Sequence, residues 1–168
     1  MYVDDQFGEI VTIWKLKPAD RVVHIGPDES LVCALSGSLT QQILIYISGG
    51  ASGDITRTCP NVHVLNCEIE GANFLPGSVS AVIMAGEPIL PREKVVAMKN
   101  WLMPGGRIAV AQFIAPRPGS VASLLRAFAR RLIAFGVSRA FEAEGLLFED
   151  RMKSASQPYE FLVYRRMT

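Results

Sequence analysis

The stretch KNWLMPGGRIAV, Lys99–Val110, contains the change from helix to strand on which the fold prediction rests. Residues 92–103 carry apolar side chains at helical spacing, which predicts a helix over this range. Pro104–Gly106 predicts its end, because proline lacks an amide donor and glycine readily adopts positive φ. The apolar run over residues 108–114 then predicts a strand that is buried on both faces.

The same pattern of short apolar runs continues outward from this stretch toward both ends of the chain. Most of these runs are rich in valine and isoleucine, which favour strands. The predicted strands are Arg21–Ile25, Gln42–Ser48, Val62–Leu65, Val79–Ala85, Ile108–Ile114, Leu147–Lys153 and Tyr159–Arg165.

Helices are predicted between most of these strands. Their ranges are about residues 3–16, 28–35, 92–103 and 120–135. Because strands and helices alternate, we expect a parallel sheet with helices on both faces. The last two strands are joined by a short turn, which only an antiparallel pair allows. No linker divides the chain, so residues 1–168 are predicted to form a single domain.

Composition excludes several classes of protein. The 168 residues are 49% apolar, with a mean hydropathy of +0.25, which excludes a disordered chain. Net charge is +1, so we expect no nucleic-acid partner. No apolar run is long enough to span a membrane, and residues 1–8 do not resemble a signal peptide, so we expect a cytoplasmic protein. The high apolar share indicates either a partner interface or a core rich in alanine and valine.

The cysteines and histidines do not form a recognisable metal or disulfide pattern. Cys33, Cys59 and Cys67 are odd in number and lack C-x-x-C spacing, so we expect reduced thiols and no metal site. His24 falls in a predicted buried strand, which favours a core histidine over a general base. His63 is expected on the solvent-facing or interfacial side of its strand.

Three stretches, taken in order, carry a resemblance to a known family. They are LKPADRVVHIG at 16–26, NFLPGSVSAVIM at 73–84 and KNWLMPGGRIAV at 99–110. Together they resemble the class I, S-adenosylmethionine-dependent methyltransferases, and within these the branch that acts on small molecules. The resemblance covers residues 16–166. We therefore expect a Rossmann-like α/β domain with seven strands in the order 3-2-1-4-5-7-6 and strand 7 antiparallel.

The resemblance also implies where a cofactor would bind, and these positions are altered. The family pocket falls on Gly26, Asp28, Tyr46, Cys67 and Glu87. His24 stands where the family has the acidic residue that opens its glycine loop. Only the first of the family's three loop glycines is kept, and two carboxylates follow it at Asp28 and Glu29. Tyr46 stands where the family uses an acidic residue to hold the ribose, although a tyrosine hydroxyl cannot grip a diol as a carboxylate does. The cofactor positions therefore indicate a degenerate member.

Two functional hypotheses follow from this combination. One is a non-catalytic, methyltransferase-like subunit that binds no cofactor and acts with a protein partner or a second copy. Its expected contact surfaces are the N-terminal helix, with Phe7 and Trp14, and the helix over 120–135. The alternative is an active methyltransferase that uses S-adenosylmethionine on a small molecule. Glu87 would then lie at the crevice mouth as a base or substrate contact.

Overall fold

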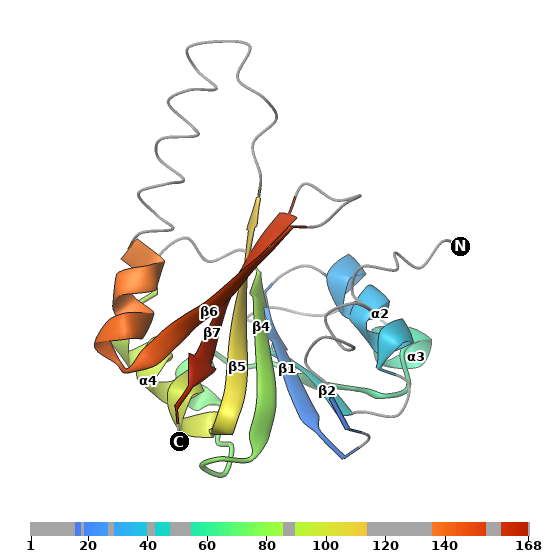
Figure 1. Ribbon diagram of the computed structural model, residues 1–168. Coiled ribbons are helices and arrows are strands. Elements are labelled where there is room, and N and C mark those ends of the chain that lie inside the picture. The colour runs from blue at the N-terminus through green and yellow to red at the C-terminus, as the bar shows by residue number, and fades with distance from the viewer. Residues whose placement is uncertain are drawn as a thin grey trace.

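The computed structural model describes residues 16–17, 19–26, 29–39, 43–47, 55–85, 90–113, 136–153 and 159–167. Within these ranges the chain forms one seven-stranded sheet (Figure 1). The strands are β1 (Arg21–Ile25), β2 (Ile43–Ile47), β3 (Val62–Leu65), β4 (Val79–Ala85), β5 (Leu102–Phe113), β6 (Leu146–Lys153) and β7 (Tyr159–Arg166). The helices are α2 (Glu29–Ser38), α3 (Ile55–Thr58), the 3-10 turn η1 (Ile69–Gly71), α4 (Arg92–Trp101) and a helical segment over residues 136–143.

The sheet has the order β3-β2-β1-β4-β5-β7-β6. Strands β1 to β5 pair in parallel, and β7 lies antiparallel between β5 and β6. The predicted topology is therefore confirmed. The helices expected over 3–16 and 120–135 fall outside the described residues, apart from Leu16.

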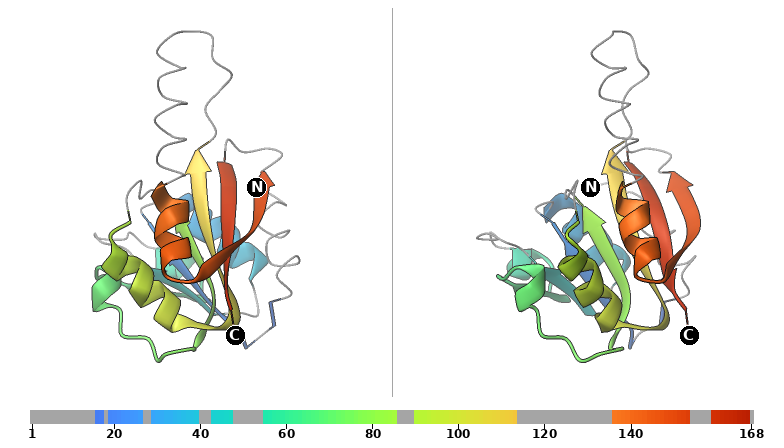
Figure 2. Two further views of the ribbon diagram at one scale, coloured as in Figure 1. Left: turned by 60° about the vertical axis from the view of Figure 1, so that its left-hand side comes forward. Right: turned by 90° about the vertical axis from the view of Figure 1, so that its left-hand side faces the viewer.

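Two separate apolar cores cover the two faces of the sheet. Neighbouring residues of β1 belong to different cores, because successive side chains of a strand point to opposite faces. Val22 packs with residues of α2 and α3, whereas Val23 packs with residues of α4 and the segment 136–143. Helices α2 and α3 accordingly lie on one side of the sheet, and α4 and the segment 136–143 lie on the other (Figures 1 and 2).

The passage from α4 to β5 differs from the sequence-based expectation. The helix ends at Trp101, and β5 begins at Leu102, which is buried and pairs with Val79. The register with β4 then jumps to Ala81 opposite Arg107, which leaves Met103–Gly106 as an irregular bulge. The predicted turn therefore lies inside a strand, because burial of Leu102 and its sheet pairing outweigh the local preference of proline and glycine for a turn.

The antiparallel strand β7 ties the helices of one face to the sheet. Arg166 donates hydrogen bonds from Nη1 to the carbonyl oxygens of Lys99, at 3.1 Å, and Leu102. These bonds satisfy carbonyls at the carboxyl end of α4, where a cation is also favoured by the helix dipole. The Tyr164 hydroxyl lies 2.6 Å from Ser138 Oγ, and its ring centroid lies 4.6 Å from that of Phe141. Strand β7 therefore anchors both α4 and the segment 136–143.

Candidate functional site

The carboxyl ends of the central strands meet at one edge of the sheet, where open α/β folds place ligands. Gly26 follows β1 there and has φ +136°. Its amide donates to the Ile47 carbonyl oxygen at 3.4 Å. A Cβ at Gly26 would lie 2.2 Å from the backbone oxygen of Ala85, the last residue of β4. Packing between strands thus requires a glycine here, with or without a ligand.

His24 and Tyr46 occupy the two strand positions at which the family resemblance expects carboxylates. They are opposite each other in the β1–β2 register, and their ring centroids lie 5.6 Å apart. His24 is 0% exposed and Tyr46 is 1% exposed. Tyr46 packs in the apolar core beneath α2 and α3. The two replacements therefore form one buried aromatic pair. Comparison of the sequence with the family one residue at a time did not reveal this contact.

Cys67 lies beyond the end of β3, at the same edge of the sheet. Its side chain is half-buried and packs against the core on the α4 face. Tyr46, in contrast, points into the core on the opposite face. The structure therefore brings Gly26, Tyr46 and Cys67 to one end of the sheet but places the last two on different sides of it.

Glu68 and Lys94 form an ion pair at this edge that the sequence analysis did not identify. Glu68 Oε2 lies 3.9 Å from Nζ of Lys94 on α4, and the Glu68 side chain is 70% exposed. Such an exposed pair contributes about 0–1 kcal/mol. Spacing along the chain gave no signal for this pair, because docking of α4 brings the two residues together. Asp28 and Glu87, the other two predicted site residues, fall outside the described residues.

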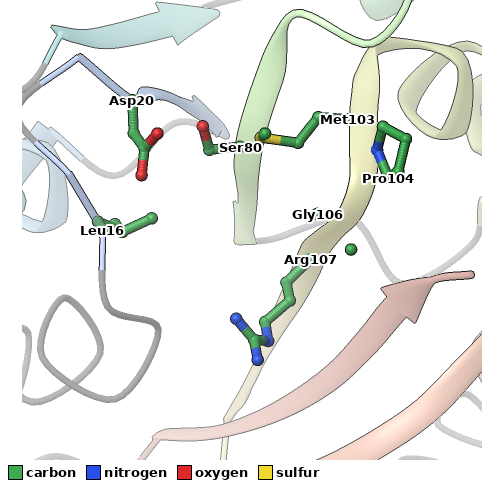
Figure 3. A pocket seen from close by; sticks show the side chains of 8 residues that line it. Leu16, Asp20, Ser80, Met103, Pro104, Gly106 and Arg107 are labelled. Atoms are coloured by element: carbon green, nitrogen blue, oxygen red, sulfur yellow. The ribbon is translucent and has the colours of Figure 1, made fainter. Parts of the chain in front are cut away.

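A cavity of about 140 Å³ lies at the opposite, amino-terminal end of β1, β4 and β5 (Figure 3). It is lined by Leu16, Asp20, Ser80, Met103, Pro104, Gly105, Gly106 and Arg107. The Asp20 carboxylate already accepts a hydrogen bond from the Lys17 amide at 2.6 Å, and Arg107 pairs with Glu149. Pockets for cofactor-sized ligands measure about 300–1,000 Å³. This cavity is too small for S-adenosylmethionine and lies at the wrong end of the strands for it.

The two histidines lie as the sequence analysis predicted. His24 is buried, and His63 on β3 is exposed. Among the residues that the structure describes, no three His, Cys, Asp or Glu side chains gather as a metal site would require. In the same part of the chain, no helix combines the length and apolarity needed to cross a bilayer.

The arrangement of strands is that of the class I S-adenosylmethionine-dependent methyltransferase fold, and solved structures with this fold match nearly the whole chain. A geranyl diphosphate methyltransferase, solved with geranyl diphosphate and sinefungin, aligns over 97% of this chain and 77% of its own, with a TM-score of 0.69 and 14% identity. The 1,6-didemethyltoxoflavin-N1-methyltransferase of Burkholderia thailandensis aligns over 99% and 79%, with a TM-score of 0.68 and 12% identity.

A further neighbour carries a different reaction on the same fold. The cyclase SpnF aligns over 98% of this chain and 82% of its own, with a TM-score of 0.73 and 12% identity. No family model matches the sequence. No curated protein matches it either. The resemblance seen in the sequence is therefore confirmed for the fold, and a fold of this kind does not by itself determine function.

Proposed function

We propose that this chain is a methyltransferase-like domain without cofactor chemistry, which serves as a binding or assembly subunit. The observation that carries the proposal is the buried pair of His24 and Tyr46. In the family that the fold resembles, both positions hold acidic residues, and the one at the position of Tyr46 holds the ribose hydroxyls of the cofactor. Here their side chains are 0% and 1% exposed, so neither ring presents a polar surface to a ligand.

The chemistry of the two positions supports this proposal further. Leu35, Leu44 and Tyr46 belong to one apolar core, in which an isolated carboxylate would be strongly destabilised by desolvation. The aromatic pair fills that space instead. The two rings, which stand where the family has carboxylates, therefore contribute to the stability of the fold rather than to ligand binding.

The role as a subunit rests on the surface and on the composition of the chain. Its 49% apolar content is high for a domain of this size. Several large apolar side chains of the described residues are exposed, namely Ile43, Leu75, Met103, Leu147, Phe148 and Met167. We therefore expect a protein partner or a second copy in a cytoplasmic setting. The two contact helices expected from the sequence, with Phe7 and Trp14 and over 120–135, lie outside the described residues.

The second candidate is an active methyltransferase that acts on a small molecule. Gly26 favours it, because the first loop glycine stands at the carboxyl end of β1, beside the ends of β2 and β4. Two of the similar structures are methyltransferases of small molecules, geranyl diphosphate and 1,6-didemethyltoxoflavin. In this case Gly26, Asp28 and Glu87 would contact S-adenosylmethionine or the substrate, with Cys67 at the same edge of the sheet, whereas Tyr46 lies buried in the core of the other face.

Calorimetric titration of the full chain with S-adenosylmethionine separates the two candidates. We expect no saturable heat up to millimolar ligand. The geranyl diphosphate methyltransferase, which has been solved with S-adenosylmethionine, is the positive control in the same buffer. A low-micromolar dissociation constant, about −8 kcal/mol of binding free energy, would overturn the non-catalytic proposal.

Light scattering on the chain purified from its own cell tests the assembly role separately. We expect a mass above that of the 18.4 kDa monomer, either from a second copy or from a stoichiometric partner. A strictly monomeric species with no partner at any concentration would contradict the assembly role, whatever the calorimetry shows.

A further inference from the structure

Two cysteines that are distant in the sequence meet on the α2 face of the sheet. Cys33 lies in α2, and Cys59 follows directly after α3, 26 residues later. Their Sγ atoms are 3.4 Å apart, and both thiols are free. Helices α2 and α3 lie side by side in Figure 1. The odd number of cysteines and their spacing in the sequence gave no sign of this contact, which depends on the docking of α2 against α3.

The backbone on both sides of the sulfurs is held in place. The Cys59 amide donates to the Ile55 carbonyl oxygen at 2.9 Å, and its own carbonyl accepts from Val62 at 3.0 Å. One turn further along α2, the Asn61 side-chain amide donates to the carbonyl oxygens of Ser36, at 3.2 Å, and Leu39, at 2.7 Å. The turn after α3 is thus already tied to α2. Joining the sulfurs therefore requires adjustment of side chains rather than docking of separate segments.

We propose that Cys33 and Cys59 form a redox-modification site, a dithiol pair that closes to a disulfide by exchange with a low-molecular-weight disulfide. One protein thiolate attacks the small disulfide, forms a mixed disulfide and releases one small thiol. The second protein thiolate then attacks the protein sulfur of that mixed disulfide and releases the second small thiol. The two protein thiols are oxidised, the small disulfide is reduced to two thiols, and no other reactant is needed.

Exposure assigns the order of the two steps. Cys33 is half-buried and reachable from solvent, so it is the attacking thiol, whereas Cys59 is 5% exposed and resolves the intermediate. Burial raises the pKa of Cys33 to about 11, and its hydrogen bond with Cys59 and the charges of Cys59 and Glu29 act in the same direction. Little thiolate therefore forms at neutral pH, so closure is slow and needs sustained oxidising conditions.

Closure would join α2 covalently to the turn that precedes β3. Helix α2 begins just beyond Gly26, at the edge of the sheet described above. The disulfide would therefore restrain a helix that begins at that edge. Cys67 cannot take part in the same folded structure, because it packs with the core on the other face. It provides a matched control thiol.

The test uses the full chain, incubated with reduced or oxidised glutathione, then denatured and titrated for free thiols. We expect the count to fall from three to one, with an intact mass lower by two hydrogen atoms. Cys67→Ser should fall from two thiols to none and lose the same mass. Cys33→Ala should form no internal disulfide, so that after oxidation its two thiols either stay free or carry glutathione. Dithiothreitol should reverse every change.

Three results would overturn the proposal. They are a disulfide that disappears in Cys67→Ser, glutathione adducts without an internal disulfide in the natural chain, and disulfides only between chains. Circular dichroism of each variant establishes that it is folded before oxidation. If Cys33→Ala fails to fold, hydrogen exchange of the backbone amides in the natural chain replaces that variant as the test. Oxidation should then slow exchange in residues 29–39 and 55–62, and an unchanged rate in both ranges would contradict the proposal.

Discussion

Replacing Gly26 by alanine tests whether the end of β1 needs a glycine for packing rather than for a ligand. At φ +136° an alanine is strained by about 1–3 kcal/mol. Its Cβ would also lie 2.2 Å from the Ala85 carbonyl oxygen. That oxygen belongs to the backbone of β4, so the conflict can be relieved only by moving one strand, at an additional cost of about 1–3 kcal/mol. We expect a total loss of about 2–6 kcal/mol, a large part of the stability of a typical domain.

Gly77→Ala is the matched control for this substitution. Gly77 has φ +71°, but a Cβ there would meet no atom within 4 Å. We expect it to cost only about 1–2 kcal/mol, the penalty of the left-handed backbone. Urea denaturation followed by circular dichroism, without any ligand, measures both variants. Equal losses within about 0.5 kcal/mol would refute the reasoning, whereas an insoluble Gly26→Ala beside a soluble Gly77→Ala would agree with it.

Three further predictions concern ionic contacts and the dithiol pair. Arg166→Met should lower the free energy of unfolding by about 1.5–3 kcal/mol, because the carbonyl oxygens at the end of α4 lose a charged donor. Arg165→Met should lower it by less than about 1 kcal/mol, because the pair of Arg165 with Glu149 spans 3.9 Å. Equal losses for the two variants in urea denaturation would contradict this difference. The hydrogen bond from Arg107 holds the pKa of Glu149 below its usual range, so this contribution to stability is complete above about pH 4.3 and is lost as pH falls through the folded-state pKa. Glu149→Gln should therefore be less stable than the natural chain at pH 7 and should match it at about pH 2 in thermal unfolding, so a constant difference would argue against the pair. Closing the dithiol pair, whose members are 26 residues apart, should raise the free energy of unfolding by about 3.5 kcal/mol, and an oxidised chain no more stable in urea than the reduced one would count against it.

Most of the sheet was predictable from local patterns. Strands β1, β3 and β4 have the predicted ends, and β7 extends only one residue further than expected. The apolar runs of β1, β4 and β7 are buried on both faces, which is the condition under which composition alone indicates a strand. The antiparallel pairing of β6 with β7 was also predicted, from the short turn between them, and the insertion of β7 beside β5 was expected from the family resemblance.

Other elements depend on contacts that no local pattern contains. The short helix α3 lies in a range where no helix was predicted, and α4 ends earlier than its periodicity suggested. In both places buried side chains decide the outcome. Ile55 is buried at the start of α3, and Leu102 is buried where β5 begins. Tertiary burial outweighs the modest preferences of single residues, which amount to less than about 1 kcal/mol each.

At the candidate site, the sequence by itself determined which residue types stand at the family positions, and therefore that most of the expected loop glycines and carboxylates are absent. Only the tertiary structure decided what the replacements do. Register places His24 beside Tyr46, strand packing confines Gly26 against Ala85, and helix docking brings Cys33 to Cys59. The physical reason is the same in each case. These pairs are separated by 22, 59 and 26 residues of chain, and their contacts exist only after the sheet and its helices have assembled.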